Sequence, residues 1–413
     1  MKKLKLAFIG CGSRVKIYSQ LAAASQEKFE LVAAADLRPE RVEFIKNLST
    51  LENFKSYESG DQLLSDLPEA DIIVIGTQDQ SHFEPCVKAL NAGYHVMVEK
   101  PLSTDLSEIR QIEALANKLK KRVMVCHVLR YTPFYKEVKR MIASGLLGEI
   151  VNVRAVEGIN PWHFSHSYVR GHWADTSKSS PMIVAKCCHD LDILRWLIGK
   201  SCKKVSSYGE LSYFTESKKH EHLPERCNHD CPEAKSCFYN AAKYTSKDFR
   251  KTWLSQIYDS YDIADDQEVL EWLESSDWGR CVYKCDNNAV DHQVVNLDFG
   301  DCTASFTVTA FEHGRHLELF GTKAVLKGGD FYRRHLGADI IVEDHHGNVT
   351  EKVFFELSDE AYHHMGGDEG LVEALYEQMV DWPLSQSLES LSEVVEGHAL
   401  AFAAEESRLE QMN

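Results

Sequence analysis

The sequence is short of positive charge and has no long apolar run. It carries 46 lysine and arginine residues against 63 aspartate and glutamate residues, a formal net charge of −17. This balance argues against nucleic acid or an anionic membrane surface as the main partner, because both bind basic surfaces. No apolar run approaches the ~20 residues that cross a bilayer. Gly10 also cuts the first apolar run too short for a signal peptide, so we expect a cytoplasmic protein.

Internal repeats and low-complexity segments are absent as well. The 413 residues are too many for one ordinary core and indicate two domains. An apolar content of 44% with 26% charged residues is typical of a soluble globular protein. Twelve cysteines without a secretion signal indicate reduced thiols or metal ligands rather than a disulfide framework.

The most informative stretch is the first apolar run, residues 6–9, and the turn Gly10-Cys-Gly12 after it. A continuous apolar run suits a strand buried on both faces of a parallel sheet. Gly10 permits a sharp turn, and Gly12 lets the backbone approach a pyrophosphate at the amino end of the next helix. A second apolar run, residues 31–35, ends in Asp36, whose carboxylate is placed to bind the ribose hydroxyls. The pattern predicts a dinucleotide site.

The cofactor choice depends on the same acid. Asp36 would repel the 2′-phosphate of NADP, so NAD is the expected cofactor and NADP the less favoured one. Arg38 and Arg41 are close in the sequence and would soften this discrimination. The third glycine of the fingerprint, which permits close helix–strand packing, is Val15 in this chain. The fit of the first helix on the sheet is therefore left open.

Helices and strands continue to alternate after the first strand pair. Buried strands are predicted over residues 71–76, 95–99 and 123–128, with a helix over 103–121 between the last two. Ligands of open parallel sheets bind at the carboxyl ends of the strands. We therefore predict a doubly wound, Rossmann-like parallel sheet over residues 1–128 that binds NAD.

A second domain is predicted over residues 129–413, where apolar and polar residues alternate along the strands. Such alternation predicts a large, mainly antiparallel open sheet with one covered face, and makes this part an α+β domain. Helices are predicted over residues 185–198, 371–379 and 391–409. Residues at about 215–290 of this domain hold a group of cysteines, and the resemblance described below implies that they form an insertion.

Three motifs resemble those of one oxidoreductase family. They are Gly10-Cys-Gly12, Glu99-Lys100-Pro101 at the end of a predicted strand, and His189-Asp-Leu-Asp192 on a predicted helix. The chain resembles the glucose–fructose oxidoreductase, inositol dehydrogenase and rhizopine-catabolism family (Gfo/Idh/MocA) over nearly its whole length, apart from the insertion. The resemblance implies a carbohydrate or polyol substrate and a homo-oligomer, a dimer or tetramer.

Lys100 follows the strand predicted over residues 95–99, so it is expected at the sheet edge where the nicotinamide lies. Alcohol oxidation needs a hydride acceptor and a group that removes or stabilises the hydroxyl proton. An ammonium group buried beside a cationic ring loses basicity, which suits it to accept a proton. The resemblance implies this role, or orientation of the carbinol, for Lys100. In the family the bond to the following proline, here Pro101, is often cis.

The second group of candidates is Lys186, His189 and Asp192, which recur every three residues and share one face of the predicted helix. A cation, an imidazole and a carboxylate on one face suit the binding of sugar hydroxyls and the relay of a proton. Relatives usually carry an aspartate where this chain has Ala185, and we expect Lys186 to take over part of its work. Lys186 and His189 are therefore catalytic candidates, and Asp192 is a candidate substrate ligand.

Further site residues are implied by the resemblance or by their place in the chain. Besides the glycines and Asp36, the residues expected at the cofactor are Ser13, Arg14, Arg38, Thr77, Asp79, His82, Glu99 and Lys100. Those expected at the substrate are His127, Arg130, Trp162, His166, Arg170 and Trp173. The last four belong, with His163, to an aromatic and basic loop that suits a carbohydrate. The segment His364-Met-Gly-Gly-Asp368 resembles a family segment near the active site.

Five cysteines lie in or next to the insertion: Cys227, Cys231, Cys237, Cys281 and Cys285. Thiols in a polar loop with little core of its own resemble a structural tetrathiolate site, and zinc would tie such a loop down. The first three are expected ligands, with Cys285 as the fourth and Cys281 nearly equal to it. The spacing differs from the common C-x2-C knuckles, so an iron–sulfur cluster and free thiols stay open as alternatives.

The expected function is NAD-dependent transfer of a hydride from a carbinol of a sugar, inositol or glycoside. The alternative is a glycoside-cleaving enzyme of the same fold, which retains its NAD and oxidises the substrate only transiently. A nucleotide-sensing regulatory protein is a third hypothesis. Net NADH formation, release of an aglycone without net NADH, and NAD binding without turnover distinguish the three.

Overall fold

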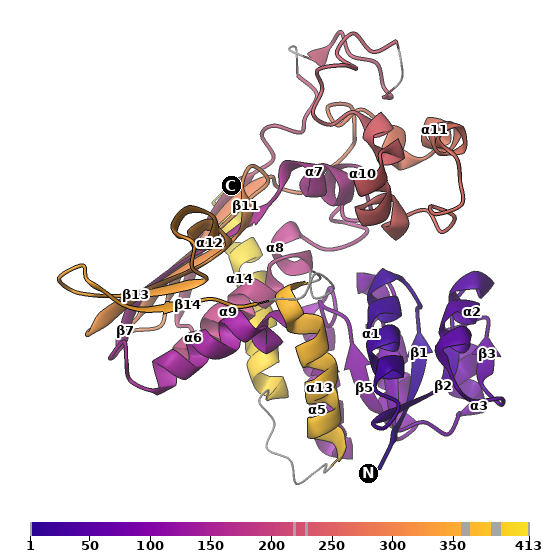
Figure 1. The fold of residues 1–413 in the computed structure, drawn as a ribbon, viewed down its shortest axis with the longest axis horizontal. Helices are drawn as coiled ribbons and strands as arrows, with labels where there is room; N and C mark the ends of the chain where they lie inside the picture. Colours follow the sequence, from indigo (N-terminus) through magenta and orange to yellow (C-terminus); the bar gives the residue numbers. More distant parts are fainter. Residues whose placement is uncertain (1, 218–219, 228–229, 357–363, 381–389, 412–413) are drawn as a thin grey trace.

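The computed structural model describes residues 2–217, 220–227, 230–356, 364–380 and 390–411. These residues form two separate β-sheets, each with its own helices, and an insertion that projects beyond them (Figure 1). Within these ranges no helix is long and apolar enough to span a lipid bilayer.

The first sheet has six strands, all parallel, in the order β3-β2-β1-β4-β5-β6. The strands are β1 (Leu4–Ile9), β2 (Phe29–Ala35), β3 (Lys55–Tyr57), β4 (Ile72–Ile75), β5 (His95–Val98) and β6 (Val123–Val125). The connecting helices are α1 (Ser13–Ala24), α2 (Pro39–Leu48), α3 (Gly60–Asp66), α4 (Phe83–Asn91) and α5 (Leu106–Leu119). This arrangement confirms the predicted doubly wound parallel sheet.

Both faces of this sheet are covered because its strands are apolar on both sides. In β1, Leu6 and Phe8 pack with α1 and α2, whereas Ala7 and Ile9 pack with α3, α4 and α5. Two helices from far along the chain complete these layers. Helix α13 (Gly367–Val380) joins the first layer, and α14 (Leu391–Glu410) joins the second.

Val15 does not prevent close packing of α1 on the sheet. It is 1% exposed, and it packs against Gly76, the residue directly after β4. A Cβ at position 76 would lie only 2.3 Å from Cγ2 of Val15. The room that a third fingerprint glycine usually provides on the helix is therefore provided on the strand side, by Gly76.

The second sheet has eight strands in the order β14-β13-β12-β11-β7-β10-β9-β8. Neighbouring strands are antiparallel except for the central pair β10 and β7, which is parallel. The strands are β7 (Ile150–Ile159), β8 (Lys204–Glu210), β9 (His292–Asp298), β10 (Thr303–Thr309), β11 (His313–Gly321), β12 (Ala324–Gly329), β13 (Ile340–Asp344) and β14 (Val349–Val353). The predicted large, mainly antiparallel sheet is confirmed.

Helices cover one face of the second sheet. Apolar residues of α6 (Pro133–Ala143), α9 (Cys188–Ile198) and α14 belong to the same core as the strands. Short helices lie beside them: α7 (Pro161–Phe164), α8 (Met182–Ala185) and α12 (Asp330–Leu336). Helix α14 thus contacts both sheets' cores and joins the two halves of the chain.

The helix predicted over residues 185–198 is wrong at its start. Helix α8 ends at Ala185, α9 begins at Cys188, and Lys186 and Cys187 lie between the two. The expected single helix face that would carry Lys186 together with His189 therefore does not form.

The chain between β8 and β9 contains the segment predicted as an insertion, and we keep that name for it. Its helices α10 (Lys247–Thr252) and α11 (Asp266–Ser275) accompany a small apolar core of its own. Trp162 from α7 enters this core and contacts Tyr244 and Phe249 edge to face. Figure 1 shows the insertion above the edge of the first sheet at which β1 and β2 end.

Candidate active site

The turn after β1 has the geometry that a dinucleotide needs. Gly10 has φ +79°, and a Cβ there would lie 2.7 Å from the backbone nitrogen of Thr77. A Cβ at Gly12 would meet one atom within 4 Å, Nη1 of Arg41 at 3.9 Å. Gly12 is the N-cap of α1 and no side chain caps this end, so the first N–H groups of the helix are available to a phosphate.

Asp36 follows β2, and the backbone holds its carboxylate in place. Oδ2 accepts a hydrogen bond from Cys11 N at 2.6 Å, and Oδ1 accepts one from Arg38 N at 2.9 Å. These contacts fix the acid beside the glycine turn, where the ribose of a dinucleotide is expected. The structure thus brings Gly10, Gly12 and Asp36 together with Ser13, the first residue of α1.

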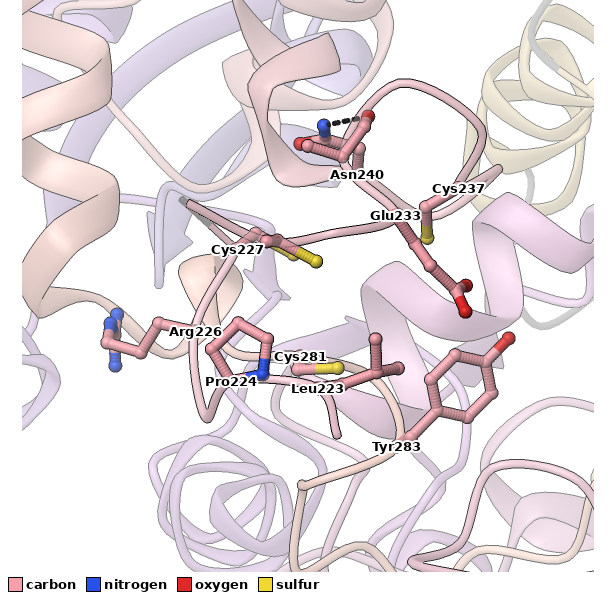
Figure 2. Close-up of a pocket in the computed structure, with 11 residues that line it drawn as sticks. Leu223, Pro224, Arg226, Cys227, Glu233, Cys237, Asn240, Cys281 and Tyr283 are labelled. Atoms are coloured by element: carbon pink, nitrogen blue, oxygen red, sulfur yellow. Dashed lines mark hydrogen bonds between the residues drawn. The ribbon is translucent and has the colours of Figure 1, made fainter. Parts of the chain in front are cut away.

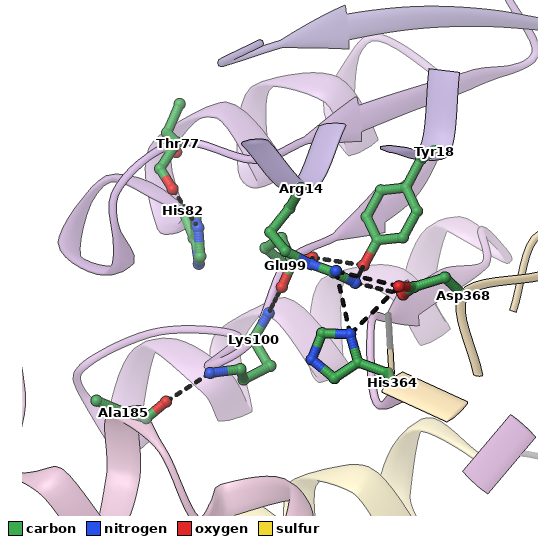
Figure 3. Close-up of polar contacts among 9 residues, drawn as sticks. All are labelled: Arg14, Tyr18, Thr77, His82, Glu99, Lys100, Ala185, His364 and Asp368. Carbon is green, nitrogen blue, oxygen red and sulfur yellow. Dashed lines mark hydrogen bonds and ion pairs between the residues drawn. The ribbon is translucent and has the colours of Figure 1, made fainter. Parts of the chain in front are cut away.

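Arg14 lies in a polar network that joins α1, the end of β5 and α13 (Figure 3). Its guanidinium is 3.2 Å from Glu99 and 2.5 Å from Asp368, and it donates to the hydroxyl of Tyr18 at 2.6 Å. The Tyr18 hydroxyl donates to Glu99 at 2.5 Å. Nδ1 of His364 lies 3.2 Å from Arg14 and 3.2 Å from Asp368.

This network keeps its two acids charged. Burial alone would raise the pKa of Glu99, but the charge of Arg14 and the hydrogen bond from Tyr18 lower it. Burial also opposes ionisation of Asp368, whereas His364 and Arg14 lower its pKa to about 2. Arg14 and Glu99, both predicted at the cofactor, are therefore a held ion pair beside the glycine turn.

Lys100 lies two residues after β5, and its bond to Pro101 is cis. Its Nζ donates to the backbone oxygen of Ala185 at 2.7 Å (Figure 3). Ala185 ends α8 in the second half of the chain, so this contact places the amine where the two halves meet. The backbone N–H of Lys100 donates to Glu99 at 3.1 Å, which connects it to the Arg14 network.

A row of alternating charges begins next to Ala185. Nζ of Lys186 is 3.3 Å from Glu157, and Glu157 is 2.9 Å from Arg315. Arg315 is also 2.7 Å from Asp190. Glu157 on β7 and Arg315 on β11 are direct partners in the strand register, so the sheet itself brings them together. Both cations are consequently neutralised by carboxylates.

His189 has one ring nitrogen to spare. Nε2 lies 2.9 Å from Arg315 and 3.0 Å from Asp190. Nδ1 is buried, and within the described part of the chain it has no hydrogen-bond partner. Burial holds the pKa of His189 well below its usual range; Arg315 and Lys100 add to this effect, and Asp190 opposes it. The ring is therefore neutral, with Nδ1 left for a substrate group.

His163 contacts the insertion. Burial keeps its pKa well below the usual range, and the charges of Lys186, His166 and Lys100 lower it further. The ring also packs against Trp253 of the insertion, with 5.1 Å between centroids. His163 therefore joins α7 to the insertion through this ring contact.

The loops after β4 and β5 are tied to each other and to the second half of the chain. His82 contacts the backbone oxygens of Pro101 at 2.7 Å and of Thr77 at 3.1 Å. Nε1 of Trp173 donates to Asp79 at 2.7 Å. Thr77, Asp79 and His82 thus lie at the carboxyl edge of the first sheet, and Trp173 reaches them from the second.

Asp192 does not join Lys186 and His189. Its buried carboxylate accepts two hydrogen bonds from Arg130, at 2.7 and 2.6 Å, and lies 3.0 Å from Nδ1 of His127. The ring of His127 stacks on that of His398, with centroids 5.0 Å apart. These contacts favour a buried supporting network for Asp192, Arg130 and His127 over direct contact with substrate.

The insertion contacts three of the predicted substrate residues, Trp162, His166 and Arg170. Trp162 lies in the insertion core, and Nδ1 of His166 is 2.5 Å from the hydroxyl of Tyr244. Arg170 donates to the backbone oxygens of Tyr239 and Arg280 at 2.8 and 2.7 Å. This placement favours a role in holding the insertion over the predicted role in binding substrate.

Glu157 and Arg315 are site residues that the sequence did not indicate. Glu157 lies on β7, which was predicted only as part of the sheet, and Arg315 lies on β11, a strand without a motif. What identifies these two residues is the pairing of opposite charges across neighbouring strands. This pairing cannot be recognised until the strand register is known.

A doubly wound sheet with an uncapped glycine turn, joined to an α/β domain whose polar residues meet its carboxyl edge, is the architecture of dinucleotide-dependent oxidoreductases. Residues 4–127 match the description "Oxidoreductase family, NAD-binding Rossmann fold", and residues 139–381 match "Oxidoreductase family, C-terminal alpha/beta domain". The chain belongs to the Gfo/Idh/MocA oxidoreductase family, which confirms the resemblance of its three motifs.

Individual relatives are distant. YteT of Bacillus subtilis (strain 168) is 24% identical over 333 residues, 78% of this chain and 76% of YteT. The scyllo-inositol 2-dehydrogenase (NAD(+)) of the same strain is 27% identical over 216 residues, 51% of this chain and 58% of the relative. The fold matches the crystal structure of scyllo-inositol dehydrogenase from Lactobacillus casei with bound NAD(H) and scyllo-inositol. That match has a TM-score of 0.64 and 18% identity, and it covers 99% and 98% of the two chains.

Proposed function

We propose that this oxidoreductase removes a hydride from a carbinol of a neutral polyhydroxy compound, a sugar, inositol or glycoside, with NAD as the acceptor. The observation that carries the proposal is the meeting of Lys100, from the end of β5, with Ala185 and its neighbours from the second half of the chain. Oxidation of a carbinol in such a site needs one group that accepts the hydroxyl proton and others that orient the carbinol.

The residues present fit a bound dinucleotide. Gly10 allows the turn, Gly12 leaves the end of α1 open, and Asp36 is held where ribose hydroxyls are expected. When bound, NAD supplies the hydride acceptor at the carboxyl edge of the first sheet. Ser13 and the backbone of the turn would hold the pyrophosphate, and Thr77 and Asp79 lie along the same edge.

Lys100 is the group that we assign to the hydroxyl proton. Its amine is held by one hydrogen bond, to the Ala185 carbonyl, and an amine has capacity for further contacts. A substrate hydroxyl next to it would pass its proton to Lys100 as the hydride leaves the same carbon. His189, neutral and with Nδ1 free in the described structure, would orient the hydroxyl by a hydrogen bond.

The charge balance of the site supports an uncharged substrate. Lys186 is paired with Glu157, and Arg315 is paired with Glu157 and Asp190, so neither cation is left to bind a carboxylate or phosphate. The groups that remain are imidazoles and an amine, which hydrogen-bond hydroxyls well. Relatives that are named inositol dehydrogenases fit this class of substrate.

A redox-neutral glycoside-cleaving enzyme is the second candidate, and one observation favours it. The family acid expected at position 185 is an alanine, and Lys186 beside it is committed to Glu157. In that reaction oxidation of a carbinol acidifies a neighbouring C–H, the aglycone leaves by elimination, water adds, and the hydride returns. Lys100 and His189 would serve both reactions, so the products must decide between them.

The deciding experiment incubates the full-length protein with NAD and panels of free sugars, inositols and aryl glycosides. Growth of NADH absorbance with free sugars or inositols supports net dehydrogenation. Release of the aryl alcohol without net NADH supports the second candidate. Tight NAD binding with no turnover of any compound would contradict both and favour a nucleotide-sensing protein.

Lys100→Ala tests the assignment of the proton acceptor. We expect kcat to fall by ~10²-fold or more, as for loss of a general acid–base group, while the Kd for NADH stays within about twofold, a shift well under 1 kcal/mol. Lys178→Ala, on an exposed lysine of the second half of the chain, is the control and should retain full activity. An unchanged kcat in Lys100→Ala would remove Lys100 from this role.

A further inference from the structure

Four of the five predicted cysteines line one small pocket in the insertion. The pocket wall includes Cys227, Cys231, Cys237 and Cys281. Figure 2 shows the sulfur atoms of Cys227, Cys237 and Cys281 directed into the same space. We propose that these four cysteines bind one zinc ion, which holds the insertion in place.

The backbone brings the four thiols together from two separate segments. Cys227 N donates to Gly279 O at 2.8 Å, and Cys281 N donates to Glu225 O at 2.9 Å, around an antiparallel bridge. Cys237 is brought back toward Cys231 by a turn in which Cys237 N donates to Glu233 O at 2.8 Å. A metal bound here would close the loop that contains α10 and α11.

The size of the pocket favours a single ion. Its cavity volume is about 20 Å³, close to the space of one water molecule and too small for an organic ligand. An iron–sulfur cluster with several inorganic atoms would also need more room. Four sulfur donors around one small space are the ligand set of tetrahedral structural zinc.

A buried positive charge beside the pocket has no carboxylate partner among the described residues. Arg170 is buried, and in the described residues it forms no ion pair with a carboxylate, although its Nη2 lies 3.3 Å from the sulfur of Cys227. Its Nη1 is buried without a hydrogen-bond partner in those residues. An unpaired buried charge is costly. Four thiolates on Zn²⁺ carry a net charge of −2, which would supply the missing counter-charge.

The structure favours Cys281 over Cys285 as the fourth ligand. Cys285 is absent from the pocket wall, and its thiol donates to the backbone oxygen of Cys281 at 3.3 Å. No three of the four pocket sulfurs lie within 4.8 Å of one another in the described chain. A tetrahedral thiolate site holds its sulfurs about 3.8 Å apart, so metal binding requires the thiols to move toward the centre of the pocket.

Elemental analysis of the purified full-length protein tests the site. We expect about one zinc per chain, as for a single closed tetrathiolate site. Cys227→Ser and Cys231→Ser should lower the zinc content at least tenfold, because each removes a thiolate ligand. Cys285→Ser should keep the metal, and so should the control Cys202→Ser, outside the pocket.

A second measurement does not depend on whether the variants fold. The wild-type protein is stripped with a chelator, and cobalt(II) is added while the thiolate-to-cobalt absorption is recorded. We expect the band to appear in wild type, and chelation to lower the Tm and expose the insertion to protease. Failure of the wild-type protein to bind zinc and cobalt would overturn the proposal, as would the finding of iron with sulfide. Retention of zinc by both ligand variants would do the same.

A separate observation concerns the choice between NAD and NADP, and it rests on the proposed use of NAD. Asp259 of the insertion forms ion pairs with Arg38 and with Arg41, the latter at 3.2 Å. These are the two cations that follow Asp36 and would otherwise receive a 2′-phosphate. The Asp259 side chain is 19% exposed, and the two arginines lower its pKa although burial would raise it. We infer that Asp259 excludes NADP by occupying both guanidinium groups.

Binding titrations of NADH and NADPH test this inference without any substrate. We expect Asp259→Ala to tighten NADPH by about tenfold or more, because it frees both guanidinium groups for charge-assisted hydrogen bonds to the 2′-phosphate. NADH should stay within about twofold. Asp262→Ala, on an exposed acid of the same loop, is the matched control. An unchanged Kd for NADPH would contradict the role of Asp259, whereas failure of wild type to bind NADH would contradict the proposed cofactor itself.

Discussion

Close packing of α1 on the first sheet needs one small residue, and either the helix or the strand side can provide it. The fingerprint glycine on α1 is Val15 here, and Gly76 after β4 supplies the room instead. Close approach of helix and strand is a property of the pair, because the Cβ atoms of both residues would compete for one space. The departure from the usual pattern is therefore confined to which element carries the small residue.

Gly76→Ala tests this exchange. The new Cβ would lie 2.3 Å from Val15 Cγ2, so we expect a loss of about 1–3 kcal/mol in the free energy of unfolding, the usual cost of overpacking. In the double variant with Val15→Ala the two changes should partly cancel, since the second removes the clashing methyl groups. Urea unfolding of the four proteins of this cycle measures the coupling. Purely additive losses would show that the two residues do not compete.

A site residue could be predicted from the sequence only where the residues next to it in the chain indicate its role. Asp36 and Lys100 follow apolar runs directly, so their place at the sheet edge could be read from the local pattern. Arg315 and Asp259 act through partners 125 and 218 or more positions away, and nothing in their own neighbourhood marks them. Their roles depend on strand register and on the folding of the insertion.

At the scale of elements, the break between α8 and α9 also depends on a distant contact that the local sequence does not reveal. The local sequence favours one helix over residues 185–198, and within it the carbonyl of Ala185 would accept from the backbone. Instead, that carbonyl accepts from Nζ of Lys100. A tertiary contact thus competes with the helix for one acceptor, and no local pattern reveals it. The long periodic helix over 391–409, in contrast, is seen at 391–410.

A prediction about the pH dependence of stability concerns strand β5. Its first residue, His95, accepts a hydrogen bond from Arg122 N at 2.9 Å, and burial, followed by the charge of Lys121, lowers its pKa to about 4. In the unfolded chain a histidine has a pKa of about 6.5, so between these values the unfolded state binds more protons. The contribution of His95 to stability should therefore be present above about pH 6.5 and be lost as the pH falls toward 4.

Urea unfolding at about pH 7, 5.5 and 4.5 measures this loss. His95→Asn keeps an acceptor but cannot be protonated, and it should show a shallower decline in unfolding free energy than wild type. His346→Asn, on an exposed turn, serves as the control. Equal slopes for His95→Asn and wild type would mean that His95 titrates alike in both states.

At the scale of the whole molecule, the insertion is the part that the sequence described least. Its cysteines marked it as unusual, and only the family resemblance implied approximate bounds for it. Its reach to Arg38 and Arg41, and its use of Trp162 as a core residue, depend on the packing of the two halves. The two sheets, in contrast, were predictable because each strand carries its own apolar period.

The exposed face of the second sheet bears on assembly. Tyr208 and Val294 are partners in the strand register and are 56% and 37% exposed. Apolar side chains in register on an open sheet face favour contact with another surface. We expect a dimer or tetramer by mass photometry, and expect Val294→Glu to shift the distribution toward single chains. A wild-type protein that stays monomeric at micromolar concentration would contradict this expectation.

The cover that α13 and α14 give to the first sheet has a consequence for synthesis. A ribosome releases residues 4–125 long before it reaches residues 367–410, so the apolar side chains that α13 and α14 cover meet water during most of translation. The nascent protein is therefore a natural client for chaperones over that interval. A frameshift between β6 and α13 would leave a complete first sheet whose helical layers permanently lack α13 and α14, and we expect proteolysis to remove such a product.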